Sequence, residues 1–126
     1  MTNLNRITLL GNIGREPKSS ATRTGKPVTR LSVATNKRYK DDEGQWQEDA
    51  QWHRCVIFGA SADYAAKLPS GALVFIEGEM TYRDYDRDVE TAEGAASVNW
   101  PVAEVLVSSI SAITKKDKRE KEDSAA

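Results

Sequence analysis

Two residue types that often build covalent or metal-bound frameworks are nearly missing from this chain, whose 126 residues include one cysteine and one histidine. A lone cysteine cannot form an intrachain disulfide and fits a reducing compartment, so we expect a cytoplasmic protein. One histidine and one cysteine cannot by themselves complete a His/Cys zinc site, and we expect neither a metal nor a cofactor. No run of about 20 apolar residues is present, which excludes a membrane-spanning helix. Asn3, Asn5 and Arg6 interrupt the N-terminus, so no secretory signal segment is expected there.

Aromatic residues are also scarce, at 7% of the chain, so the places where they occur are informative. The length suits one domain with one hydrophobic core, which we assign to residues 1–113. Residues 114–126 carry mixed charge without a large apolar anchor, and we expect a charged, flexible tail there.

Charge is distributed unevenly along the chain, although the formal net charge is only −1. Residues 1–40 contain nine lysines and arginines and one acidic residue, Glu16, for a net charge of +8. Residues 41–114 contain four basic and fourteen acidic residues, for a net charge of −10. Such segregation favours an anionic partner bound by one part of the fold. The alternative is that acidic neighbours neutralise the basic block once the chain has folded.

The stretch Gln51–Gly59 combines a strand pattern with an unusual second face. Alternate side chains of a strand share a face. One face is mostly apolar and indicates core: His53, Cys55 and Ile57. The other face carries two aromatics and a cation: Trp52, Arg54, Val56 and Phe58. Aromatics beside a cation suit the stacking of bases and the pairing of phosphates, whereas the alternative is a strand buried on both faces with its arginine reaching solvent at one end.

Four further segments show strand patterns, and one short segment shows a helix pattern. With Gln51–Gly59 as the third, the expected strands are Leu4–Gly14, Val28–Asn36, Leu73–Tyr85 and Val98–Ile113. The expected helix is Ser61–Leu68, with Ser61 as its N-cap. This order is that of the OB-fold, an all-β barrel of five strands with one short helix between strands 3 and 4. OB barrels bind oligonucleotides across the face of their strands 2 and 3 and the adjoining loops.

The connections between these strands are predicted to be polar loops, including one over Lys18–Lys26. Lys37–Ala50 begins with three cations around Tyr39 and also holds Trp46, a pattern typical of single-strand binding. Both aromatics have an alternative role, which is to pack the loop onto its own barrel. The loop after Tyr85 is acidic and is expected to repel an anionic partner. Pro101 is placed near the start of the last strand, since a proline is tolerated only at a strand start or edge.

In order and spacing, five short motifs resemble those of the bacterial single-stranded DNA-binding proteins, from Leu4 to about Ile113. The motifs are Leu4-Asn5-Arg6, Gly11-Asn12-Ile13-Gly14-Arg15-Glu16-Pro17, Ala34-Thr35-Asn36, Gln51-Trp52-His53-Arg54 through Phe58-Gly59, and Phe75-Ile76-Glu77-Gly78. The resemblance implies sequence-independent binding of single-stranded DNA in replication, recombination and repair. It also implies a homotetramer of single OB domains.

Carried over by position, the resemblance assigns roles to individual residues. The base-stacking aromatics fall on Tyr39, Trp52, Phe58 and Tyr85. Contacts between subunits fall on His53, Phe75 and Glu77. To these we add the candidate phosphate partners: Arg6, Arg15, Lys26, Arg30, Lys37, Arg38, Arg54 and Arg83.

The sequence departs from the family pattern in several places. Tyr39 and Tyr85 stand where relatives often have tryptophan, so stacking should be weaker at those two sites. Ser19-Ser20-Ala21 stands where relatives often carry an aromatic and a basic residue. The sequence ends at Ala126 without the acidic tip through which typical members recruit replication and repair enzymes, so that recruitment becomes doubtful.

Two other functions fit parts of the sequence. One is an OB-fold accessory protein of the primosome type, whose main partner is another replication protein. The other is a nucleic-acid enzyme in which Asp84, Asp86 and Asp88, at alternate positions of one strand, bind Mg²⁺. A solvated hairpin tip explains the same three acids, and we expect no catalytic activity.

Overall fold

The computed structural model describes residues 2–113, and most of them lie in strands. The strands are β1 (Ile7–Ile13), β2 (Lys18–Ala21), β3 (Pro27–Lys40), β4 (Trp46–Phe58), β5 (Leu73–Thr91) and β6 (Gly94–Ala112). Within this range the chain forms one helix, α1 (Ala60–Ala66), between β4 and β5. No helix among residues 2–113 has the length and apolar character needed to cross a membrane.

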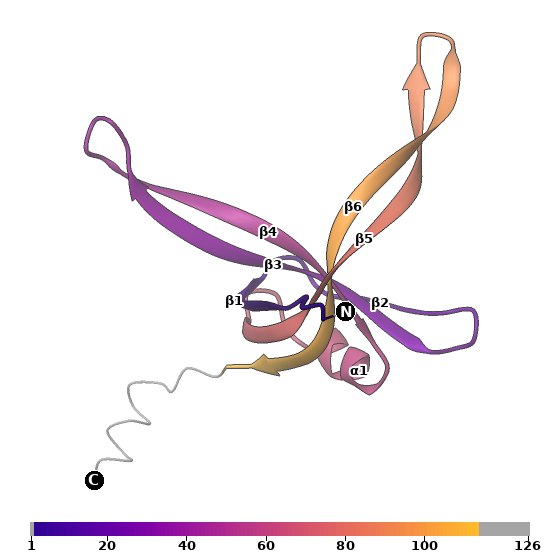
Figure 1. The fold of residues 1–126 in the computed structure, drawn as a ribbon, viewed down its shortest axis with the longest axis horizontal. Coiled ribbons are helices and arrows are strands. Elements are labelled where there is room, and N and C mark those ends of the chain that lie inside the picture. The colour runs from indigo at the N-terminus through magenta and orange to yellow at the C-terminus, as the bar shows by residue number, and fades with distance from the viewer. Residues whose placement is uncertain (1, 114–126) are drawn as a thin grey trace.

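Five strands close into a barrel in the order β1-β5-β6-β4-β3, with β3 returning to β1 (Figure 1). Neighbouring strands are antiparallel except β4 and β6, which run parallel where Cys55 faces Val105. The short β2 pairs with the first residues of β3, outside this ring. Gly11 permits the closure, because a Cβ atom there would lie 2.2 Å from the carbonyl oxygen of Ala34 on β3. The predicted five-stranded OB barrel with one short helix is therefore confirmed.

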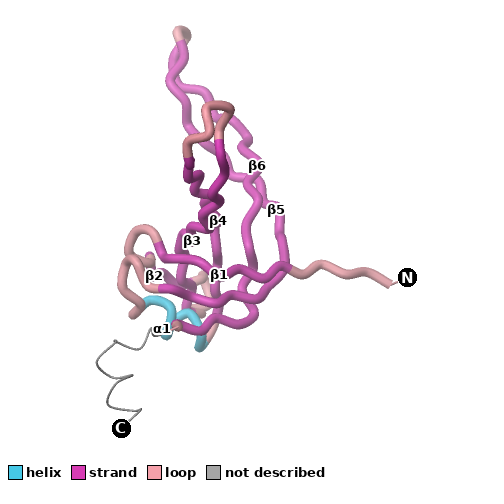
Figure 2. Tube along the Cα trace, turned by 90° about the vertical axis from the view of Figure 1, so that its left-hand side faces the viewer, coloured by secondary structure: helices cyan, strands magenta, loops and turns pink. Residues whose placement is uncertain are grey.

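The hydrophobic core fills the barrel. Its most deeply buried side chains come from four strands: Val33, Ile57, Val74, Ile76 and Val105. The helix α1 packs Ala62 and Ala65 against this core at the end of the barrel opposite the long hairpins (Figure 2). The Cys55 thiol lies inside, and burial raises its pKa to about 12, so it is an unreactive core residue.

Two long hairpins extend from the barrel and diverge, one formed by β3 and β4 and one by β5 and β6 (Figure 1). The β3–β4 ladder runs without a break from Val28 and Phe58 to Lys40 and Trp46. The predictions of loops over Lys37–Ala50 and directly after Tyr85 are therefore wrong, and β2 also occupies part of the predicted loop over Lys18–Lys26. A ribbon exposed on both faces lacks the apolar alternation that marks a strand in a sequence.

Two local predictions are also wrong. The helix begins at Ala60 with Gly59 as its N-cap and no capping side chain, so Ser61 lies inside the first turn. Pro101 lies in the middle of β6, opposite Asp84, rather than near the strand start. In that region β6 pairs with β5 alone, so the proline occupies an edge strand, where it is tolerated.

Candidate nucleic-acid interface

The register of β3 and β4 decides which predicted residues share a face, since directly opposed residues of an antiparallel pair lie on the same side. One face carries Arg30, Arg38, Lys40, Trp46, Trp52 and Arg54. The opposite face carries Lys37, Tyr39 and His53. The alternation predicted for Trp52 and Arg54 therefore agrees with the structure. Tyr39 does not share their face, and its stacking role stays a prediction.

The Trp52 side chain is exposed, and its indole lies against Gly14, which directly follows β1. Trp52 is 61% exposed, although it lies on the strand that forms the core with its other face. A Cβ atom at Gly14 would lie 2.5 Å from Cζ3 of Trp52, so the indole occupies the space that this glycine leaves. The Gly14 backbone is fixed by its N–H, which donates to the Ser32 carbonyl at 2.9 Å. Gly14 thus positions Trp52.

We expect Gly14→Ala to weaken binding of the predicted ligand, single-stranded DNA, without unfolding the barrel. The backbone at Gly14 is outside the left-handed region, so alanine is tolerated, but its methyl group displaces the indole. Fluorescence titration with oligo-dT should show about fivefold weaker binding, as for the loss of one weak base stack. The thermal midpoint should stay near that of the wild type. In the double variant with Trp52→Ala the two losses should not add, and additive losses would contradict the contact.

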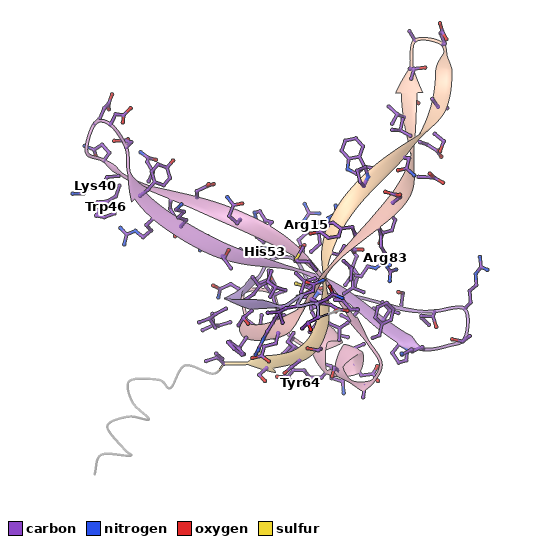
Figure 3. The ribbon with its side chains drawn as sticks, viewed as in Figure 1. Arg15, Lys40, Trp46, His53, Tyr64 and Arg83 are labelled. Atoms are coloured by element: carbon purple, nitrogen blue, oxygen red, sulfur yellow. The ribbon has the colours of Figure 1, made fainter. Side chains whose placement is uncertain are left out.

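A basic cavity of about 510 Å³ opens on the same side of the barrel. Three predicted cations and one predicted aromatic line it: Arg15, Arg30, Arg54 and Tyr85. They come from four separate segments, and all three arginine side chains are exposed to solvent. In Figure 3, Arg15 and Arg83 lie where the two hairpins diverge from the barrel. The structure therefore brings together residues that lie far apart in the sequence. Arg15 and Tyr85, for example, are separated by 70 positions.

The cavity also contains a buried carboxylate, Glu104, which is 5% exposed. The Tyr85 hydroxyl donates to Glu104 Oε1 at 2.8 Å. This hydrogen bond raises the pKa of Tyr85, with smaller contributions from burial and from the negative charge of Glu104. The bond fixes the Tyr85 ring at the mouth of the cavity. Glu104 was not among the predicted site residues, and the available signal was a single charge within the apolar run of β6.

We expect Tyr85→Phe to keep the ring but to destabilise the fold. The variant leaves Glu104 without its hydroxyl donor, which should lower the free energy of unfolding by about 1–3 kcal/mol at neutral pH in a urea titration. The folded-state pKa of Tyr85 is raised, so the hydrogen bond stabilises the wild type fully at pH values below the ordinary tyrosine pKa of about 10. The advantage should shrink as pH rises through the folded-state pKa. An equal difference between the two proteins at neutral and strongly alkaline pH would contradict the role of this bond.

Phe58 lies apart from this cavity. It lines a separate cavity of about 610 Å³ together with Arg6 and Lys26. The Lys26 Nζ atom lies 5.8 Å from the centre of the Phe58 ring, a cation–π contact. Arg6 also forms an exposed ion pair of 4.0 Å with Glu77. The structure therefore joins Phe58 to two predicted cations but not to Trp52.

A family model described as "Single-strand binding protein family" matches residues 4–121. The chain belongs to this family. It is 41% identical over 83 residues to a single-stranded DNA-binding protein of Xanthomonas campestris pv. campestris, a match that covers 65% of this chain and 48% of the relative. It is 37% identical over 84 residues to single-stranded DNA-binding protein 1 of Chlorobaculum tepidum, which covers 66% and 52%. The chain thus spans about half the length of the curated relatives it matches.

Two solved structures are similar to this chain. The single-stranded DNA-binding protein of Thermus aquaticus, in a deletion mutant, superposes with a TM-score of 0.69 at 26% identity, covering 88% of this chain and 51% of that chain. A Plasmodium falciparum SSB in complex with ssDNA superposes with a TM-score of 0.72 at 24% identity, covering 90% and 98%. At that identity the second match shows a shared fold.

The predicted subunit contacts lie in two places. His53 is half-buried on the ribbon face opposite Trp52, and a hydrogen bond of 2.9 Å joins its Nε2 to Thr35 Oγ1. Phe75 and Glu77 lie on β5 opposite Leu10 and Thr8 of β1. Leu10 is 54% exposed, so this side of the barrel presents apolar surface. The association of subunits through these residues stays a prediction.

The β5–β6 hairpin has two unlike faces. One face carries Arg83, Tyr85, Val98 and Trp100. The other carries Tyr82 and the acids Asp84, Asp86, Asp88 and Glu90. Tyr85 therefore points away from the acids that were expected to repel DNA. Trp100, directly opposite Tyr85, had no assigned role, and with Trp52 it lines a third cavity of about 400 Å³ between the diverging hairpins.

The structure gives no support to the Mg²⁺ site considered for Asp84, Asp86 and Asp88. The three acids share a face, as their alternation predicts, but successive ones lie about 7 Å apart along an extended strand. Across residues 2–113 no group of three His, Cys, Asp or Glu side chains is placed to hold a metal ion.

Proposed function

We propose that this domain binds single-stranded DNA without sequence preference and protects it during replication, recombination and repair. The observation that carries the proposal is the outward face of β4, where an exposed Trp52 adjoins Arg54 and the basic cavity. An exposed aromatic ring stacks on any base, and cations pair with phosphates, so neither contact reads sequence. Membership of the single-strand binding family supports the same function.

In this proposal the strand crosses the barrel face between the two hairpins. Trp52 and Tyr85 stack bases near the basic cavity, and Phe58 does so beside the second cavity. Tyr39 reaches DNA only if the strand passes around the edge of the β3–β4 ribbon. The proposed phosphate partners are Arg6, Arg15, Lys26, Arg30, Lys37, Arg38, Arg54 and Arg83.

The proposal is tested by comparing ligands at one salt concentration. Labelled oligo-dT and oligo-dA should both bind, and a duplex of the same length should bind much more weakly, because its bases are already stacked on each other. Fluorescence anisotropy measures the three affinities. Equal affinity for duplex and single strand would contradict the stacking mechanism and leave only non-specific charge attraction.

We also propose that the protein is a homotetramer in the cytoplasm, associated with the nucleoid. One OB barrel covers about 4–16 nucleotides, so association lengthens the bound track. The exposed apolar surface around Leu10 and Phe75 supports a subunit contact. Light scattering should give the mass of a tetramer, and the mass of a monomer at micromolar concentration would contradict this.

Catalysis has no part in the proposal, because stacking and charge pairing neither form nor break covalent bonds. The family match supports DNA as the main partner over the accessory-protein alternative, in which another replication protein would be the main partner. The prediction about recruitment of replication and repair enzymes concerns residues 114–126, which lie outside the described residues.

A further inference from the structure

An aromatic residue and two cations gather at the tip of the β3–β4 hairpin. The Arg38 guanidinium carbon lies 5.2 Å from the centre of the Trp46 ring, and the Lys40 Nζ atom lies 5.1 Å from it. Trp46 is 60% exposed. Figure 3 shows Lys40 and Trp46 side by side at the far end of the hairpin, away from the barrel. We call Arg38, Lys40 and Trp46 the tip cluster.

The fold does not require an indole at this place. The hairpin extends away from the barrel, so the alternative in which Trp46 packs a loop onto the barrel is wrong (Figure 1). The turn itself is held by Asp41, whose Oδ1 accepts hydrogen bonds from the backbone N–H groups of Gln45 at 2.8 Å and Glu43 at 3.0 Å. Trp46 contributes neither to that turn nor to the core.

The cations of the tip cluster remain available to an anion. Glu48 is directly opposite Arg38 on the same face, yet the ion pair found within residues 2–113 at 4.0 Å or less joins Arg6 and Glu77. The Arg38 guanidinium therefore lies over the indole rather than on a carboxylate. An indole that holds two cations at its ring presents both chemical partners of a nucleotide, a π-face and positive charge.

We propose that the tip cluster is a second contact site for the same DNA strand, in which Trp46 stacks a base while Arg38 and Lys40 bind the adjoining phosphates. The inference rests on the proposed function. It adds Trp46 and Lys40 to the proposed DNA-binding residues, and it places the phosphate contact of Arg38 at the tip of the hairpin. The register puts the tip cluster on the same face as Trp52, and the six residues from Trp46 to Trp52 span about 20 Å of strand.

This separation makes the contribution of the tip cluster depend on ligand length. A short oligonucleotide held at Trp52 does not reach the tip. A longer one reaches both sites, and the second contact is then intramolecular and raises the overall affinity. Trp46 is thus a residue that determines how much DNA the domain occupies.

The experiment uses the full chain and two ligands: an oligo-dT of about 3 nucleotides, which is too short to span the roughly 20 Å between Trp52 and Trp46, and one of about 30, which exceeds the upper site size of one OB barrel. Trp46→Ala should weaken binding of the long ligand by about fivefold or more and leave the short ligand unchanged. Trp46→Phe, which keeps a π-face, should recover most of the loss. Tyr82→Ala removes an even more exposed aromatic ring from the acidic face of the other hairpin, and it should change neither affinity.

The cations are tested by the salt dependence of long-ligand binding. The double variant Arg38→Gln, Lys40→Gln should reduce the slope of log affinity against log salt by about 1.4, as for two lost phosphate contacts. Lys67→Gln, on an exposed residue at the end of α1, should leave the slope unchanged.

The outcomes separate this inference from the proposed function. If Trp52→Ala weakens both ligands while Trp46→Ala weakens neither, the tip cluster is not a DNA site and the proposed function stands. If Trp46→Ala weakens short and long ligands equally, the length-dependent second contact is contradicted. If the wild type binds neither ligand, the proposed function fails as well.

Discussion

Trp52→Ala is expected to weaken binding of oligo-dT by about 5- to 150-fold, which corresponds to the range of about 1–3 kcal/mol per stacked base established for proteins of this kind. The side chain is 61% exposed and lies outside the hydrophobic core, so the barrel should remain folded. Removal of the indole takes away a π-face but no charge. The affinity should therefore fall at every salt concentration by a similar factor, while the salt slope stays the same.

The matched control for this prediction is Tyr82→Ala. Tyr82 is the most exposed large aromatic residue of the described chain, at 77%, but it shares its face with Asp84 and Asp86. Its removal should leave oligo-dT binding unchanged. If Tyr82→Ala and Trp52→Ala weakened binding to the same extent, the outward face of β4 would have no special role. Intrinsic fluorescence and a thermal melt of each variant verify that the fold is intact.

Replacing Arg15, Arg30 and Arg54 together by glutamine is expected to have the second large effect, on the salt dependence of binding. All three side chains are exposed and line the cavity of about 510 Å³ beside Trp52. Each phosphate contact on single-stranded DNA contributes about −0.7 to the slope of log affinity against log salt, so the slope should decrease in magnitude by about 2. The affinity at low salt should fall most, because counterion release is then most favourable.

A second charge-reduced variant controls for the loss of net positive charge. Arg23 and Lys67 are exposed and do not line the cavities described above. Their joint replacement by glutamine should leave the slope of oligo-dT binding close to that of the wild type. A slope that depended only on the number of cations removed, and not on their position, would contradict a localised phosphate site. Titrations at four or more salt concentrations measure the slopes.

Most of the fold and the centre of the site follow from local sequence patterns. Alternation in Gln51–Gly59 predicts that Cys55 and Ile57 are buried and that Trp52 is exposed, and both expectations agree with the structure. The order of strands and helix predicts the barrel. These predictions succeed because burial of one strand face imposes a period of two on the sequence.

The length of the two hairpins was not predicted, because their outer parts have no buried face. The residues of β3 beyond Asn36 and of β5 beyond Tyr85 are mostly polar on both sides, and they are paired with the neighbouring strand of the hairpin. The side of the ribbon on which a residue lies then depends on register, which no local pattern reveals. Tyr39 and Trp46 were grouped in one loop in the sequence, but they lie on opposite faces of the ribbon.

Contacts between distant segments could not be predicted from the sequence either. Glu104 beneath Tyr85, Gly14 beneath Trp52 and Trp100 opposite Tyr85 each depend on how the barrel closes. In the sequence Gly14 suggests only a bend. In the structure it leaves the space for an indole that arrives from a strand nearly forty residues further along the chain.

The most direct test of the proposed DNA site is a chemical-shift map of the isotope-labelled protein during addition of oligo-dT. The largest changes are expected at Gly14, at the Trp52 indole N–H and at Arg54, with further changes at Tyr85. The acidic face of the β5–β6 hairpin, from Tyr82 to Glu90, should change little. Changes centred on that acidic face, or saturation of binding without a change at Trp52, would contradict the assignment of the outward face of β4 as the DNA platform.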